Sequence, residues 1–147
     1  MNAEVVVYGA SGYTGKLIAW HLAERGIPFI AAGRNAGRLA EQMARVPELA
    51  GARYECVAVE HDEVALAKLF SGRKVVYNVV GPFMQLGDPV VRACLAAGCH
   101  YLDTTGEQDW MLHLKRTYGA AFAARSLLLV PACSWMWLGG QLAAELA

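Results

Sequence analysis

The sequence predicts an α/β fold in which about six parallel strands form a doubly wound sheet with helices on both faces. Three observations lead to this prediction. Short apolar runs alternate along the chain with longer segments of helical periodicity, as in consecutive βαβ units. The first apolar run passes directly into a glycine-rich turn that opens a helix. The 147 residues match the size of one domain, and no repeat or low-complexity linker divides them.

Six short runs rich in apolar and β-branched residues are expected to be the strands. The first reads Val-Val-Val-Tyr, a continuous apolar run typical of strands covered by helices on both faces. The fourth reads Val-Val-Tyr-Asn-Val-Val and is ended by Gly81 and Pro82. In chain order, the expected strands are residues 5–8, 29–32, 54–59, 75–80, 100–103 and 127–130.

The segments between these strands carry the start and stop signals of helices. Gly26 and Gly98 follow periodic stretches, where glycine commonly lies just past a helix end. Asp62 and Asp88 are expected to be N-caps, the second with Pro89 at the first helical position. With these caps included, the expected helices are residues 13–25, 35–45 (Leu39 and Met43 inward), 62–70, 88–97 and 108–125, and another begins at 139–147.

Composition and charge exclude several classes of protein. Hydrophobic residues make up 56% and charged residues 18%, which excludes intrinsic disorder. The 13 basic residues balance the 13 acidic ones, so we expect no nucleic-acid partner. The most apolar stretch, residues 127–140, is interrupted by Pro131 and is shorter than the roughly 20 residues of a transmembrane span. The first residues lack the basic segment of a signal peptide, so we expect a cytoplasmic location.

Cysteine and histidine spacing argues against a metal site. The four cysteines include no C-x-x-C pair, and no histidines lie at a standard ligand spacing. We therefore expect no metal and four reduced, mostly buried thiols. These are Cys56, Cys94, Cys99 and Cys133.

The turn after the first strand carries the most informative motif. It reads Gly-Ala-Ser-Gly-Tyr-Thr-Gly over residues 9–15, a G-x-x-G-x-x-G variant of the dinucleotide-binding fingerprint. In such a turn one glycine allows the tight bend, one lets the backbone approach a diphosphate, and one lets the helix pack closely on the strand. The helix N-terminus favours the diphosphate charge. A nucleoside-triphosphate P-loop would need other residues at Ala10 and Leu17, so the motif indicates a Rossmann-type dinucleotide site.

The end of the second strand favours NADP(H) over NAD(H). NAD-binding folds place an acidic residue there to hold the ribose 2′-hydroxyl, but this chain reads Ala-Gly-Arg-Asn over residues 32–35. Arg34 is expected to hold a 2′-phosphate through its guanidinium. Asn35 would donate a hydrogen bond, and Arg38 would add positive charge one turn later.

Two further strands end in candidate site residues. Ligands bind open α/β sheets beyond the carboxyl ends of the strands. After the fourth strand, Gly81 and Pro82 would bring a rigid backbone to the adenine-distal half of the cofactor. After the fifth strand, Asp103 and Glu107 are candidates for orienting substrate or transferring protons. The alternative is that Thr104 or Thr105, with Glu107 or Gln108, caps the next helix.

The catalytic pair of short-chain dehydrogenases is not expected here. That pair is Tyr-x-x-x-Lys, and no tyrosine in this chain has a lysine four residues later. The candidate cofactor-binding residues are Gly9, Ser11, Gly12, Tyr13, Thr14, Gly15, Arg34, Asn35, Arg38, Asn78, Gly81, Pro82 and Phe83.

Four motifs together resemble a known family. They are VVVYGASGYTGKLIAWHLAERG, AAGRN, YNVVGPF and YLDTTGE, in this order, and they lie within residues 4–133. In these motifs the chain resembles the NADP-binding domain of the saccharopine dehydrogenase-like oxidoreductases, which include trans-acting enoyl reductases. The resemblance implies diphosphate contacts at the glycine turn, 2′-phosphate contacts at Arg34 and Asn35, and nicotinamide-side contacts at Gly81, Pro82 and Phe83.

The resemblance has two departures. Family members are usually more than twice as long, and a second domain supplies much of their substrate pocket and often their dimer contacts. We expect residues 1–147 to be one dinucleotide-binding domain without that second domain, either a fragment or a natural truncation. In residues 131–137 the Gly, Phe and Asp of the family's Pro-x-Cys-Gly-Phe-Asp-Ser are also replaced, so any role of those three residues does not carry over.

These observations predict the cofactor domain of a reductase that moves hydride to or from a small or lipid-like substrate. A non-catalytic NADP(H) sensor acting through a partner protein, or a structural module with a vestigial motif, is the alternative. An apolar cluster near the end of the chain is expected to support a homodimer. Its residues are Trp135, Met136, Trp137 and Leu138.

Overall fold

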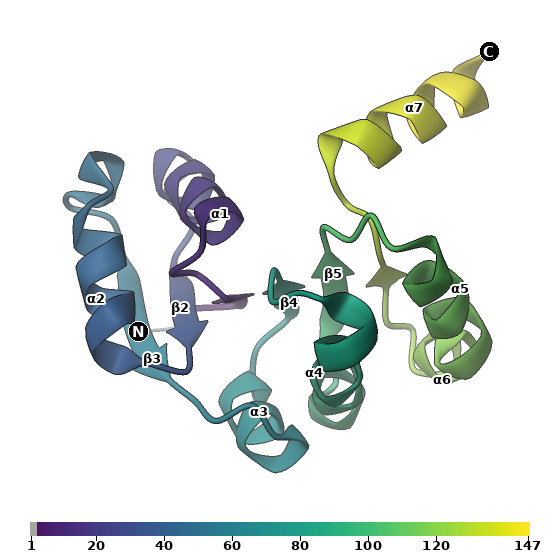
Figure 1. Cartoon of the computed structure of the whole chain (residues 1–147), viewed down its shortest axis with the longest axis horizontal. Helices are drawn as coiled ribbons and strands as arrows, with labels where there is room; N and C mark the ends of the chain where they lie inside the picture. The colour runs from purple at the N-terminus through teal and green to yellow at the C-terminus, as the bar shows by residue number, and fades with distance from the viewer. Residues whose placement is uncertain (1–2) are drawn as a thin grey trace.

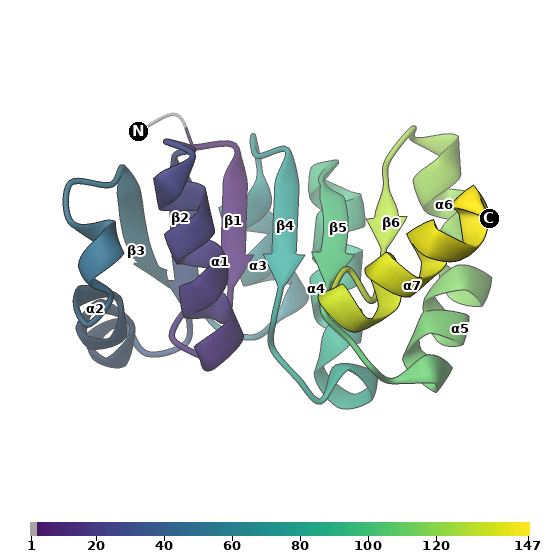
Figure 2. The same ribbon diagram turned by 90° about the horizontal axis from the view of Figure 1, so that it is seen from above.

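Residues 3–147 form one six-stranded parallel sheet in the computed structural model, which describes this range except the side chains of Trp135 and Met136. The strand order is β3-β2-β1-β4-β5-β6, and Figure 2 shows the strands side by side with their carboxyl ends at one edge. This order confirms the doubly wound fold. The strands are β1 (Val5–Tyr8), β2 (Phe29–Gly33), β3 (Tyr54–Ala58), β4 (Val75–Asn78), β5 (His100–Asp103) and β6 (Leu129–Val130).

Helices cover both faces of the sheet (Figure 1). Helices α1 and α2, with the short η1, bury the apolar core of one face, and α3 to α6 bury the core of the other. Helix α7 extends beyond β6 on the same side as α1. The bounds are α1 (Tyr13–Glu24), α2 (Ala36–Ala44), η1 (Pro47–Leu49), α3 (Glu63–Phe70), α4 (Phe83–Ala97), α5 (Gln108–Thr117), α6 (Gly119–Ala124) and α7 (Trp135–Leu146).

The continuous apolar run of β1 lies at the centre of the sheet. Val7 packs into the core on the α1 side, while Val6 and Tyr8 pack into the core on the α3 side. Strand β1 pairs with β2 on one side and with β4 on the other. The chain therefore reverses its direction of winding between β1 and β4, and the crevice at their carboxyl ends is where open α/β sheets bind ligands.

Several helix signals are confirmed. Asp62 caps α3 by accepting hydrogen bonds from the backbone N–H groups of Val64 and Ala65, both at 3.0 Å. Gly98 ends α4 with a left-handed φ of +76°. Leu39 and Met43 are fully buried on α2.

The start of α4 was predicted wrongly. The helix begins at Phe83, so Pro89 lies inside it and Asp88 does not cap it. The cause is Glu107, whose carboxylate accepts hydrogen bonds from the N–H groups of Phe83 and Met84 at 2.7 and 2.9 Å. A cap supplied from a distant part of the chain moves the helix start six residues earlier than the local signal.

Other boundaries differ for local reasons. The predicted strand over 75–80 ends at Asn78, because the Asn78 side chain takes the N–H of Val80 at 3.0 Å. The predicted helix over 108–125 is broken at Tyr118 into α5 and α6. Helix α7 begins at Trp135 rather than near residue 139. None of the helices in the described part of the chain is long and apolar enough to cross a membrane.

Candidate functional site

The glycine turn connects β1 to α1 at the crevice. Gly9 has a left-handed φ of +94°, and the N–H groups of Gly9 and Ala10 both donate to the carbonyl of Ala32 at the end of β2. A Cβ on Gly9 would lie 2.8 Å from Cγ2 of Val80 in the loop after β4. Only glycine therefore lets the turn lie directly against that loop.

Gly15 packs the first turn of α1 against the glycine turn. It is buried, and a Cβ there would lie 2.5 Å from the carbonyl oxygen of Gly9 and 2.6 Å from the Cα of Ala10. Gly12, by contrast, is exposed and donates its N–H to the same Gly9 carbonyl at 3.0 Å. The first and third glycines thus have the turn and packing roles that the motif predicts.

No side chain of the described residues caps the N-terminus of α1. Asn35 caps α2, Asp62 caps α3 and Glu107 caps α4, whereas within the described part of the chain α5 and α7, which also begin at this edge, lack a side-chain cap as α1 does. The first two residues of α1, Tyr13 and Thr14, are exposed at this edge. An uncapped helix start bounded by a closely packed glycine turn fits a diphosphate, whose oxygens accept hydrogen bonds from such N–H groups.

Arg34 lies just past the carboxyl end of β2. It is exposed, and within the described residues its guanidinium makes neither a hydrogen bond nor an ion pair. Asn35 uses its Oδ1 to accept from the N–H of Arg38, which leaves its Nδ2 free to donate, and the Arg38 side chain is exposed. The segment from the end of β2 into the first turn of α2 therefore carries two arginines and an amide, a donor set suited to a 2′-phosphate.

Tyr8 and His61 form a pair beside Arg34. The Tyr8 hydroxyl lies 2.7 Å from His61 Nδ1, and the two rings are stacked with centroids 5.9 Å apart. Burial raises the pKa of Tyr8 to about 12 against an opposing effect of the Arg34 charge, so the phenol stays protonated. Within the part of the chain that the structure describes, His61 Nε2 is buried without a hydrogen-bond partner. Sequence reasoning missed this pair because its members lie 53 residues apart.

The loop after β4 forms the opposite wall of the crevice. Gly81 and Pro82 are exposed and joined by a cis peptide bond. Phe83 is only 8% exposed and belongs to the apolar core, so its side chain is mainly a packing residue. Asn78, which the sequence placed among the cofactor contacts, is fully buried with both polar atoms bonded inside the protein. Direct contact between Asn78 and a ligand is therefore not supported.

The two carboxylates after β5 have structural partners. Asp103 is fully buried and accepts four hydrogen bonds, at 2.8 to 3.0 Å. Their donors are the Tyr101 hydroxyl, the Trp110 indole N–H and the backbone N–H groups of Thr105 and Ala132. Glu107 caps α4 rather than α5. This geometry leaves no free carboxylate oxygen on Asp103 for proton transfer.

Of the two threonines for which a capping role was the alternative prediction, Thr105 makes a hydrogen bond just before α5. Thr105 is buried, and its Oγ1 accepts from the N–H of Glu107 at 2.9 Å, just before α5 begins. Glu107 is the N-cap residue of α5, and its side chain makes no cap bond to that helix. The capping box expected at this helix start is therefore absent.

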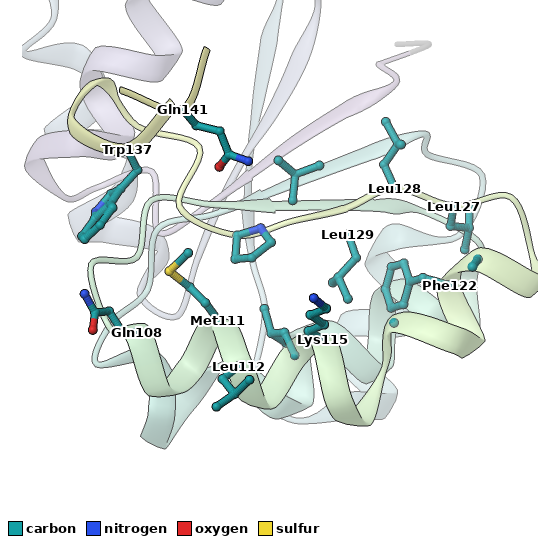
Figure 3. Close-up of a pocket in the computed structure, with 15 residues that line it drawn as sticks. Gln108, Met111, Leu112, Lys115, Phe122, Leu127, Leu128, Leu129, Trp137 and Gln141 are labelled. Atoms are coloured by element: carbon teal, nitrogen blue, oxygen red, sulfur yellow. The ribbon is translucent and has the colours of Figure 1, made fainter. Parts of the chain in front are cut away.

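The apolar residues near the chain end lie around the start of α7, next to the loop after β5. Trp137 lines a groove of about 810 Å³ between α5, α6, β6 and α7, shown in Figure 3. Its walls are mainly leucine, methionine and phenylalanine side chains, with Gln108, Lys115 and Gln141 among them. Leu138 is 43% exposed. The predicted dimer contacts of the Trp135 and Met136 side chains lie outside the described residues.

Sequence comparison relates the chain to a characterised type of domain. The model of the family described as "Saccharopine dehydrogenase NADP binding domain" matches residues 5–124. A probable mitochondrial saccharopine dehydrogenase-like oxidoreductase of Arabidopsis thaliana is 32% identical over 147 residues, covering 90% of this chain and 32% of the relative. A trans-acting enoyl reductase of Mycobacterium ulcerans is 32% identical over 134 residues, with the same two coverages. A lipid droplet localized protein of Caenorhabditis elegans is 31% identical over 140 residues, covering 90% and 33%.

Solved structures share the fold. Apo saccharopine dehydrogenase of Saccharomyces cerevisiae superposes with a TM-score of 0.67 at 15% identity, over 88% of this chain and 26% of that one. An NADPH-dependent quinone oxidoreductase of Escherichia coli, complexed with NADPH, superposes with a TM-score of 0.60 at 17% identity, over 80% and 45%. The chain spans about a third of the length of the curated relatives it matches.

Proposed function

The chain belongs to the saccharopine dehydrogenase NADP-binding domain family, whose cofactor is NADP(H), and we propose that it binds this cofactor across the crevice between the glycine turn and the loop after β4. In this proposal it is the cofactor-binding part of an oxidoreductase. NADPH, when bound, supplies the hydride that such an enzyme transfers. The residues of the chain bind and orient the cofactor.

Each end of the crevice has its own task in this proposal. The N–H groups at the start of α1, in the turn over residues 9–15, bind the diphosphate. Arg34 binds the 2′-phosphate, with Asn35 donating from its Nδ2 and Arg38 adding charge. Gly81 and Pro82 present exposed backbone to the nicotinamide side.

One observation carries the proposal. In the part of the chain that the structure describes, α1 begins without a side-chain cap, and Gly15 lets its first turn pack directly against the backbone of the glycine turn. The guanidinium of Arg34, which is unpaired within the described residues, lies at the end of the neighbouring strand. Free N–H groups and a free guanidinium at one crevice match the two phosphate sites of NADPH.

The substrate class is a further part of the proposal. Relatives carry the names enoyl reductase and lipid droplet localized protein, which favours a small or lipid-like substrate with a reducible carbon. Incubating the protein with NADPH and α,β-unsaturated acyl compounds, and following NADPH absorbance, tests hydride transfer. Binding of NADPH without its oxidation would favour a cofactor-sensing role over a catalytic one.

Self-association and location also remain proposals. Helix α7 exposes Leu138, Leu142 and Leu146 by 43, 53 and 87%, spaced four residues apart on one helix face. This apolar face supports a homodimer. Light scattering that finds only monomer at high micromolar concentration would contradict it.

The cytoplasmic location predicted from the sequence would be checked by microscopy of the tagged protein.

The discriminating experiment compares NADPH with NADH. Calorimetric titration should give a lower Kd for NADPH, and Arg34→Ala should raise that Kd roughly 10- to 100-fold while leaving NADH nearly unchanged, because a charge-assisted phosphate contact is lost. Arg116→Ala, an exposed arginine on α5, is the matched control. Equal loss of both dinucleotides, or no preference in the unchanged protein, would contradict the role of Arg34.

A further inference from the structure

The three buried polar residues of the described chain belong to one hydrogen-bond network. They are Asn78, Asp103 and Thr105, all with 0% exposure. Buried polar groups are costly unless they are fully bonded, so a connected set of them marks a place where the backbone must be held in one arrangement. The network lies between the ends of β4 and β5, next to the loop after β4.

One arm of the network holds the start of this loop. Asn78 Oδ1 accepts from the N–H of Val80 at 3.0 Å, and Asn78 Nδ2 donates to the Tyr101 hydroxyl at 3.2 Å. The Tyr101 hydroxyl donates to Asp103 Oδ2 at 2.8 Å. Burial raises the pKa of Tyr101 well above its ordinary value, so the phenol is protonated near neutral pH and donates to Asp103.

The other arm holds the end of the loop. Asp103 Oδ1 accepts from the N–H of Thr105 at 3.0 Å, and Thr105 Oγ1 accepts from the N–H of Glu107 at 2.9 Å. The Glu107 carboxylate accepts from Phe83 and Met84, one N–H on each oxygen. Residues 79–84 are therefore attached at both ends to Asp103 through side chains.

We propose that this network positions the loop over residues 79–84 against the glycine turn for the nicotinamide half of the cofactor, and that Glu107 is the positioning residue that sets the loop's far end. The inference rests on the proposed function. Between the two arms, Gly81 and Pro82 remain exposed toward the crevice, and Gly9 leaves room for Val80 on its other side. Glu107 acts through the backbone of the loop and touches no ligand.

This arrangement predicts different effects on the two halves of the cofactor. The adenosine half would bind at Arg34 and the α1 N-terminus, which Glu107 does not contact. Adenosine 2′,5′-bisphosphate lacks the nicotinamide half, so its affinity reports only on binding at Arg34 and the α1 N-terminus. The affinity for NADPH reports on both halves of the cofactor. A change in NADPH affinity alone therefore measures the contribution of the loop over residues 79–84.

The test is calorimetric titration of both ligands into Glu107 variants. Glu107→Ala should weaken NADPH binding about tenfold and leave adenosine 2′,5′-bisphosphate unchanged, because the loop loses two charge-assisted hydrogen bonds. Glu107→Gln keeps one oxygen that can accept and should show a smaller loss of NADPH affinity. Glu63→Gln is the matched control, because Glu63 also ties α3 to α4 through Arg92 but does not contact the loop.

The outcomes separate the two proposals. Equal weakening of both ligands in Glu107→Gln, or no weakening of either in any Glu107 variant, would overturn the positioning role and leave the proposed function standing. Absence of NADPH binding by the unchanged protein would overturn the proposed function, and this inference with it. If Glu107→Ala fails to fold, Glu107→Gln carries the comparison alone.

Discussion

At the residue scale, the glycine turn depends on the close contact between the backbone of Gly15 and the backbone of Gly9 and Ala10. A methyl group on Gly15 would push these two segments apart. A Cβ on Gly15 would meet the backbone of Gly9 and Ala10 at 2.5 and 2.6 Å, and backbone cannot move aside as a side chain can. Gly15→Ala should therefore lower the free energy of unfolding by about 1–3 kcal/mol and weaken NADPH binding. Urea denaturation and calorimetry measure the two effects.

Gly119→Ala is the control for this substitution. Gly119 begins α6, where an added Cβ would meet no atom within 4 Å, so alanine should leave stability unchanged or raise it by up to about 1 kcal/mol. If the two alanine variants had the same stability, the close packing described for Gly15 would be incorrect.

Individual residues also show how far the site was predictable. The roles of Gly9 and Gly15 followed from the sequence because the glycine motif is local and its spacing has a mechanical meaning. Asn78 was assigned to the cofactor because it ends a strand, but its side chain turns inward to Val80 and Tyr101. The sequence carries no spacing signal for a bond between residues 78 and 101.

At the scale of elements, strands were easier to predict than helix starts. The apolar run of β1 needed no partner to be recognised as a buried central strand. The start of α4 depends on Glu107, which lies 24 residues from Phe83, so the nearer aspartate and proline gave a wrong boundary. Helices α5 and α6 are separated at Tyr118, and no proline marks this break in the sequence. For that reason the two were predicted as one helix.

A titratable contact joins α4 to the segment of α5 and α6. Asp88 Oδ1 accepts hydrogen bonds from His113 Nε2 and from the Tyr118 hydroxyl. Burial by itself raises the pKa of Asp88, but these two hydrogen bonds together with the charges of His113 and Arg92 outweigh it, and the net pKa is lowered from 3.8. Because the folded-state pKa is below the unfolded one, the contact stabilises the protein above the unfolded pKa and is lost as the pH falls through the folded pKa.

Because the pKa of Asp88 is lower in the folded protein, the effect of Asp88→Asn on stability should depend on pH. At pH 7 the substitution should lower the free energy of unfolding by about 1 kcal/mol, a value reduced for the partial exposure of the pair. The difference from the unchanged protein should shrink below about pH 4. Urea denaturation at pH 7 and pH 3 measures it. Asp109→Asn, at an exposed site in the first turn of α5, should show a smaller and less pH-dependent change. A constant difference for Asp88→Asn at both pH values would contradict the contact.

At the scale of the whole molecule, two different surfaces are present. The crevice at the carboxyl edge of the sheet holds the free N–H groups of α1 and the guanidinium of Arg34. The apolar groove of Figure 3 lies beside β6, between α5, α6 and α7. The sequence predicted a doubly wound parallel sheet, and the strand order that the structure shows brings the turn, Arg34 and the loop after β4 to the crevice.

The central claim is that NADPH lies across this crevice, and amide chemical-shift mapping by nitrogen–proton correlation NMR tests it most directly. NADPH is added stepwise to the isotope-labelled protein, and the shift of each backbone amide is followed. The account predicts the largest changes in residues 9–15, 34–35 and 79–84, with the lining of the groove nearly unaffected. Changes confined to the groove between α5, α6 and α7, or no changes at millimolar NADPH, would contradict it.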